Sequence, residues 1–177
     1  MKEYMKRLAL TLDETDVSGL SKWPDVLLMS TRVFVAGNGG SAAIASHFVV
    51  DLLKTINKPI SAISLVDNVP VLTAIGNDVG YDEVFSRQLS YHFASPMDAL
   101  ILISSSGNSP NVARAALYAQ DFKMSLLTLS GFQPMNKIRT IGEVVSPAHQ
   151  VWVNSNDYGI VEDVHHACMH AVVDAMK

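Results

Sequence analysis

Five short apolar runs, each separated from the next by a longer stretch of chain, most limit what this sequence can fold into. The runs cover residues 33–36, 60–65, 99–103, 125–129 and 150–153. This alternation predicts βαβ units around a parallel sheet. Four of the runs are almost continuously apolar, as expected for strands that helices cover on both faces. We therefore predict an α/β fold of three layers, with a parallel sheet between two layers of helices.

Apolar spacing and capping residues predict the helices. They are expected over residues 2–12, 22–30, 42–56, 69–75, 82–93, 111–120 and 157–176. The clearest start is Ser109-Pro110, because a hydroxyl N-cap precedes a proline at the first helical position, where no N–H is needed. No repeat or linker divides the 177 residues. We expect one domain over 1–177, with a helical segment over about 1–30 and the sheet and C-terminal helix over 31–177.

Composition excludes several classes of function. The net charge of −4 does not provide the basic stripe that direct nucleic-acid binding needs. Cys168 is the only cysteine, which excludes an internal disulfide or a thiolate zinc cluster and suits a reducing compartment, so we expect a cytoplasmic protein. No apolar run approaches the roughly 20 residues of a membrane span, and the charged N-terminal stretch is typical of neither a signal peptide nor an anchor.

Two polar turns follow predicted strands. Residues 37–41 read Gly-Asn-Gly-Gly-Ser, and residues 104–109 read Ser-Ser-Ser-Gly-Asn-Ser. Each turn precedes a predicted helix, so backbone N–H groups and hydroxyls can surround an anion there. Both turns lie at carboxyl ends of parallel strands and can therefore meet at one site. The alternative is ordinary turn chemistry, which also favours glycine, serine and asparagine.

These turns belong to a longer series of motifs. Gly-Asn-Gly-Gly-Ser is followed by His47-Phe48, Ile-Gly-Asn-Asp-Val-Gly-Tyr at 75–81, Val-Phe-Ser-Arg at 84–87 and the serine turn. In this order the chain resembles the sugar isomerase (SIS) domain family, and within it the phosphoheptose isomerases. The resemblance implies a flavodoxin-like SIS fold, a homotetramer with intersubunit sites, and interconversion of sedoheptulose 7-phosphate and D-glycero-D-manno-heptose 7-phosphate for bacterial surface polysaccharide.

The resemblance also implies roles for individual residues. Asn38 and Asp78 would line the sugar. The phosphate would bind to the glycine and serine turns, through Gly39, Gly40, Ser41, Ser104, Ser105, Ser106 and Ser109. The acid and base, Asp51 and His170, would exchange protons through an enediol. One zinc ion would bind to His47, Asp51, Glu162 and His170. Asp51 stands where the family has glutamate, and Glu162 where it has glutamine.

The C-terminal helix carries two kinds of side chain. An apolar stripe is predicted for Val161, Val164, Cys168, Ala171, Val172 and Ala175, which leaves Glu162, Asp163, His166, His170 and Asp174 on the opposite side. That polar side is either a plain solvated face or a site covered by a neighbouring subunit. His166 is an additional candidate ligand, and Asp163 and His165 are expected to be more peripheral. Cys168 is predicted to be structural.

Two questions stay open at this stage. If Asp51 and His170 bind metal tightly, a metal-bound water or His166 carries the proton instead. The rival to an enzyme is a non-enzymatic SIS protein of assembly or regulation, similar to the family's replication-initiator-associating members. Residues 67–75 resemble those members too, and Asp51 favours them. His170 argues against them, because they lack this histidine.

Overall fold

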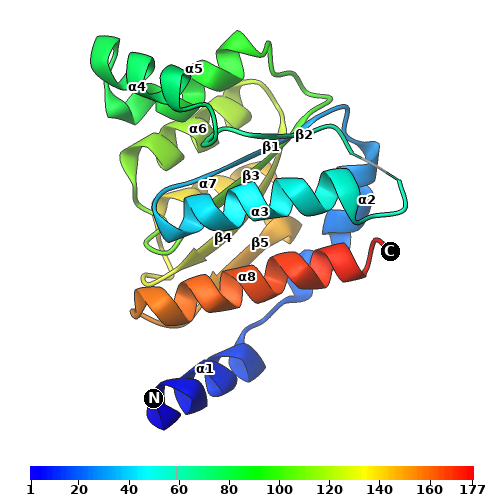
Figure 1. The fold of residues 1–177 in the computed structure, drawn as a ribbon, viewed down its shortest axis with the longest axis vertical. Coiled ribbons are helices and arrows are strands. Elements are labelled where there is room, and N and C mark those ends of the chain that lie inside the picture. Colours follow the sequence, from blue (N-terminus) through cyan, green and yellow to red (C-terminus); the bar gives the residue numbers. More distant parts are fainter. Residues whose placement is uncertain (59) are drawn as a thin grey trace.

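The computed structural model describes residues 1–58 and 60–177 and contains a parallel sheet of five strands (Figure 1). The strands are β1 (Val33–Gly37), β2 (Ala62–Ser64), β3 (Ala99–Ser104), β4 (Ser125–Gly131) and β5 (Gln150–Val153). Their order in the sheet is β2-β1-β3-β4-β5. Each strand falls on one of the predicted apolar runs, which confirms the predicted parallel α/β architecture.

Helices cover both faces of the sheet. They are α1 (Lys2–Glu14), α2 (Trp23–Met29), α3 (Gly40–Lys54), α4 (Val69–Asp78), α5 (Val84–Tyr91), α6 (Pro110–Asp121), α7 (Lys137–Val145) and α8 (Tyr158–Asp174), with short 3₁₀ turns at Ser18–Lys22, Tyr81–Glu83 and Pro147–His149. One face packs against α2, α3 and α8, and the other against α4 to α7. Within the described ranges, no helix is both long enough and apolar enough to cross a lipid bilayer.

The strands divide their side chains between two cores. Val33 and Val35 of β1 join the core under α3 and α8, whereas Phe34 and Ala36 join the core under α4 to α7. This division follows from the two-residue period of a strand. Since both faces of β1 and β3 are buried, their sequences are continuously apolar, as predicted.

Helix α7 was not predicted from the sequence. It begins after Asn136, whose side-chain oxygen accepts a hydrogen bond from the backbone N–H of Arg139 at 3.1 Å. Only Ile138 and Gly142 of this helix are buried. Ile138, Ile141 and Val145 recur at three- and four-residue spacing and pack against one core, so helical periodicity was a second local signal beside the asparagine cap, and the prediction missed it.

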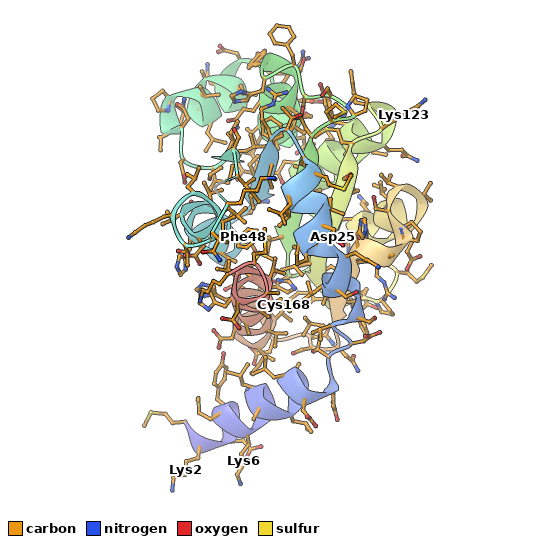
Figure 2. The ribbon with its side chains drawn as sticks, turned by 90° about the vertical axis from the view of Figure 1, so that its right-hand side faces the viewer. Lys2, Lys6, Asp25, Phe48, Lys123 and Cys168 are labelled. Carbon is orange, nitrogen blue, oxygen red and sulfur yellow. The ribbon has the colours of Figure 1, made fainter. Side chains whose placement is uncertain are left out.

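Helix α1 lies apart from the rest of the chain, at the lower end of Figures 1 and 2. None of its residues is buried. It is tied to α8 by the Tyr4 hydroxyl, which donates to Asp163 at 2.7 Å, and by an ion pair of 3.1 Å between Arg7 and Asp157. The remaining helices on this side pack closely, and Figure 2 shows Phe48 on α3 and Cys168 on α8, two members of the same core.

Candidate active site

The two predicted turns meet in one polar cavity of about 260 Å³. Its lining residues are Asn38, Gly39, Gly40, Ser41, Ser104, Ser105, Ser106, Ser109, Tyr158 and Glu162. The turns are neighbours because β1 and β3 pair in parallel up to Gly37 and Ile103, so both strands end at the same edge. A larger hollow of about 610 Å³ between α6 and α7 is more apolar, and neither of the two predicted turns lines it.

Backbone packing shapes the first turn. A Cβ atom at Gly37 would come within 2.8 Å of the carbonyl oxygen of Ile103, so only glycine allows β1 to lie this close to β3. Gly39 has a φ of +56° and forms the N-cap of α3. The chain thus enters α3 with the helix N-terminus directed at the cavity, where unpaired N–H groups favour an anion.

Serine hydroxyls supply most of the side-chain donors. Ser41, Ser104 and Ser105 are buried. The Ser105 hydroxyl has no hydrogen-bond partner among the described residues, whereas Ser104 Oγ accepts from the N–H of Gly107 at 3.2 Å. A buried hydroxyl without a partner is unfavourable unless a ligand oxygen completes it. The cavity therefore has the chemistry of an anion site.

Glu162 is the one charged residue among the lining residues of this cavity. Its carboxylate lies against Gly40, because a Cβ at that glycine would overlap it. Burial first, and then the negative charge of Asp163, raise the pKa of Glu162 above its ordinary value. A carboxylate in this position opposes a fully charged phosphate, so Glu162 distinguishes this pocket from one lined by neutral donors alone.

A buried amide pair holds Asn38 at the rim. Asn38 and Asn111 exchange two side-chain hydrogen bonds of 2.9 Å, and the Tyr81 hydroxyl donates to Asn38 at 3.0 Å. The sequence analysis did not single out Asn111, since a lone asparagine in a helix carries little signal. Asp78, which was expected to line the sugar, is exposed at the end of α4 and does not line this cavity.

Three histidines gather beyond the anion pocket, between α3 and α8. His47, His166 and His170 each offer a donor nitrogen, and these nitrogens all lie within 4.8 Å of one another. His47 Nδ1 and His166 Nε2 are 2.8 Å apart. Burial, followed by the nearby His170 and His47, lowers the pKa of His166. Imidazole nitrogens at such distances fit a metal ion, which is bound by the nitrogen lone pairs.

The four predicted metal residues do not all lie in this cluster. His47 and His170 belong to it, and Asp51 Oδ2 lies 3.8 Å from His47 Nε2. Thr55 also donates to Asp51 Oδ1 at 3.1 Å. Glu162 lines the anion pocket and is not a member of the cluster, whereas His166, named as an additional candidate, is.

Helix α8 corrects part of its expected apolar stripe. His165, expected to be peripheral to the site, is not a member of the histidine cluster; it is fully buried, and its Nε2 donates to the carbonyl of Ser130 at 3.2 Å. Burial lowers the pKa of His165 to about 4. Ala171 and Ala175, assigned to the apolar stripe, are exposed. The buried side of α8 is therefore rotated from the predicted apolar stripe toward His165. This is possible because a neutral histidine with a hydrogen bond can occupy the core.

Cys168 is buried in the core between α3 and α8, as the sequence predicts. Burial raises the pKa of its thiol to about 11. The thiol is therefore protonated near neutral pH and is a poor nucleophile. This environment agrees with a packing role.

The fold and the strand-end cavity define the general class. A parallel sheet between two layers of helices, with an anion pocket at the carboxyl ends of its strands, is the architecture of a phosphosugar-binding α/β domain. The family model described as "SIS domain" matches residues 3–131.

Known proteins narrow the class further. The chain is 37% identical to a phosphoheptose isomerase of Helicobacter pylori over 179 residues, which cover 99% of this chain and 90% of the relative. It is 36% identical to that of Bordetella avium over 149 residues, or 82% and 73% of the two chains. The solved phosphoheptose isomerase of Neisseria gonorrhoeae superposes with a TM-score of 0.84 at 28% identity, covering 96% of this chain and 91% of that one. The chain belongs to the SIS domain family and, within it, to the phosphoheptose isomerases.

Proposed function

We propose that this chain is an aldose–ketose isomerase that interconverts sedoheptulose 7-phosphate and D-glycero-D-manno-heptose 7-phosphate. The observation that carries the proposal is the meeting of the glycine and serine turns in one donor-rich cavity. Family membership agrees with it. In this proposal Ser41, Ser104, Ser105, Ser106 and Ser109 bind the phosphate, Asn38 binds the sugar, and Asp78 contributes only if the substrate or a neighbouring chain brings it closer.

The spacing along α3 supports a long substrate. His47 lies seven residues after Gly40, which corresponds to about 10 Å along the helix axis. An open-chain seven-carbon sugar phosphate can span this length, with its phosphate at the glycine turn and its carbonyl end near the histidines. Asp51 and His170 flank His47 and are proposed to carry the proton between the first two sugar carbons; while His170 is bound to the metal, Asp51 alone has this role.

Zinc is the cofactor of this proposal, one ion for each site. The imidazole nitrogens of His47 and His170 suit such an ion. A bound zinc ion supplies a Lewis acid that polarises a carbonyl. The chain's own residues anchor the phosphate, orient the sugar and move the proton.

A homotetramer in the cytoplasm completes the proposal. His47 and His170 are exposed on the single chain. Proton transfer within a sugar is favoured by a site that excludes water. A neighbouring subunit that covers this face of α8 would close the site, with a small sugar phosphate as the ligand.

The test is direct turnover of sedoheptulose 7-phosphate by the full chain, with and without added zinc, followed by NMR of the sugar. We expect the aldose product from the wild type and none from His170→Ala. His92→Ala, which removes an exposed histidine on the far side of the sheet, is the matched control and should keep the activity. Asp51→Glu, which lengthens the carboxylate, should preserve or raise the rate. A folded wild-type protein that leaves the sugar unchanged in both conditions would refute the proposal.

A further inference from the structure

We infer that the metal site of this chain has three imidazole ligands, His47, His166 and His170, and that Glu162 and Asp51 lie outside the ligand set. The inference rests on the proposed function, which includes the metal. It differs from the set expected from the sequence, in which His166 was only an additional candidate. Its basis is where the side chains of α3 and α8 lie.

Helix geometry brings the three rings together. His166 and His170 are four residues apart on α8 and share one face. That face meets His47 of α3, and the ring centroids lie 4.5 to 5.3 Å apart. The two helices are joined by a common core that includes Phe48 and Cys168, so the rings are presented from rigid elements.

The distances between nitrogens suit a common ion. Zn–N bonds of about 2.0–2.1 Å at a tetrahedral angle place two ligand nitrogens about 3.3 Å apart. His47 Nδ1 and His166 Nε2 are 2.8 Å apart, so an outward movement of about 0.5 Å would admit the ion. One nitrogen from each of the three rings lies within 4.8 Å of the other two. Side-chain torsions alone can supply the adjustment.

Glu162 belongs to the neighbouring site. It lies one turn before His166 on the same face of α8, against Gly40 at the start of α3. There it shares the cavity with the serine turn. Residues 162, 166 and 170 lie on one side of α8 but belong to two sites. Glu162 lines the anion pocket, whereas His166 and His170 lie beside His47.

Asp51 faces the other nitrogen of the His47 ring. Its Oδ2 lies 3.8 Å from Nε2, whereas Nδ1 faces His166. This distance is an ion-pair distance, and the carboxylate must move about 0.8 Å closer to accept a hydrogen bond from Nε2. With that hydrogen bond made, the proton is on Nε2 and the Nδ1 lone pair is left for the metal. Carboxylates commonly orient metal-binding histidines in this way. Asp51 is thus a positioning residue for the metal site, whatever proton transfer it also performs.

Metal affinity tests the inference without reference to turnover. Metal-free full-length protein would be titrated with zinc in competition with a chromophoric chelator, and with Co²⁺, whose visible absorption reports the ligand set. We expect one zinc ion per chain in the wild type. Asp51→Asn should weaken binding by about 10- to 100-fold, as loss of an outer-shell partner does. His166→Ala should weaken it more than Asp51→Asn and change the Co²⁺ spectrum.

Glu162→Gln is the matched control, since it removes a carboxylate one turn away and should leave zinc affinity and the Co²⁺ spectrum unchanged. His166→Gln, which keeps a polar side chain of similar length, replaces the alanine variant if that variant fails to fold. Loss of zinc in Glu162→Gln with retention in His166→Ala would overturn the inference. A wild type that isomerises the sugar but binds no zinc would also overturn it and leave the proposed function standing. Zinc binding through His166 without turnover would support the inference and refute the function.

Discussion

Ser105 shows how one residue links stability to binding. Its side chain is 4% exposed, and its hydroxyl has no partner within the part of the chain that the structure describes. A buried unpaired hydroxyl lowers stability by about 1–3 kcal/mol. The free protein thus carries an unfavourable feature that a phosphate oxygen would relieve.

Ser105→Ala should therefore weaken sugar-phosphate binding without destabilising the protein. A hydrogen bond to a charged group contributes about 1.5–3 kcal/mol, so calorimetry should show a loss of affinity of about tenfold or more. Chemical unfolding should show an equal or higher free energy of unfolding. Ser86→Ala is the control with the opposite expectation. Ser86 donates to Glu83 at 2.6 Å, and neither residue lines the cavity. It should lose stability and keep affinity, and the reverse pattern would contradict the assignment of this turn.

His165 makes stability depend on pH. Burial lowers its pKa from the ordinary value of 6.5 to about 4 in the folded state, so the unfolded chain binds its proton first on acidification. The stabilisation is present above about pH 6.5 and is lost as the pH falls toward 4, by about 3 kcal/mol in total. Urea unfolding across this range, with a chelator present, measures the loss. His165→Gln keeps a donor for Ser130 but cannot titrate, so its unfolding free energy should fall less, and an unchanged pH profile would exclude His165 as the cause.

At the scale of elements, the start of α7 holds the serine turn in place. The Lys137 N–H donates to Asn108 Oδ1 at 3.0 Å, and the Ile138 N–H donates to the carbonyl of Gly107 at 3.1 Å. Gly107 has a φ of +63° and lies directly against Asn136, the N-cap of α7. A helix on the far face of the sheet thereby determines the shape of the anion pocket.

Gly107→Ala should be strongly destabilising. Left-handed backbone costs a residue with a side chain about 1–2 kcal/mol, and the added methyl group would overlap Asn136, which adds about 1–3 kcal/mol. Gly76→Ala is the control for an added methyl group, since Gly76 lies within α4 and only Val84 Cγ1, at 4.0 Å, is near the added Cβ. Thermal unfolding should therefore rank the wild type and Gly76→Ala above Gly107→Ala. Equal losses in the two variants would show that α7 does not clamp the turn.

At the scale of the whole molecule, α1 indicates a missing neighbour. Met5 is 61% exposed and Leu12 is 41% exposed, and they are seven residues apart on one side of the helix. Leu8, between them on the same side, packs against the core of its own chain, so this side of α1 is only partly covered. A helix of 13 residues is marginal in water without a packed apolar face. Figure 2 shows α1 extending from the rest of the chain. A second copy of the chain is the partner that the proposed tetramer provides.

Light scattering should give the mass of a tetramer at micromolar concentration. Met5→Glu combined with Leu12→Glu should reduce that mass, because two charges would replace the apolar side chains. Lys6→Glu is the control, since it adds negative charge to the same helix without removing an apolar contact, and it should leave the mass unchanged. A fully active monomer would contradict both the tetramer and the intersubunit site.

The elements of the sheet were predicted, and α7 was missed. Each strand and its following turn form a local pattern, and β1 with residues 37–41 is recognisable from consecutive residues alone. Helix α7 is amphipathic, with Ile138, Ile141 and Val145 on one side, so its local pattern was present in the sequence and was overlooked. The burial of His165 was not predicted, because its hydrogen bond to Ser130 joins residues 35 positions apart.

Local pattern alone established the three-layer fold and the two strand-end turns, because strand period, helix caps and glycine turns each depend on residues close in sequence. Which residues lie together in each site depended on the packing of the helices. His47 meets His166 across 119 residues, and Glu162 lies at Gly40 rather than beside His47. Both facts follow from the position and rotation of α8 against α3. That arrangement is determined by the packing of both helices on one face of the sheet. The spacing of residues within a single helix carries no information about that arrangement.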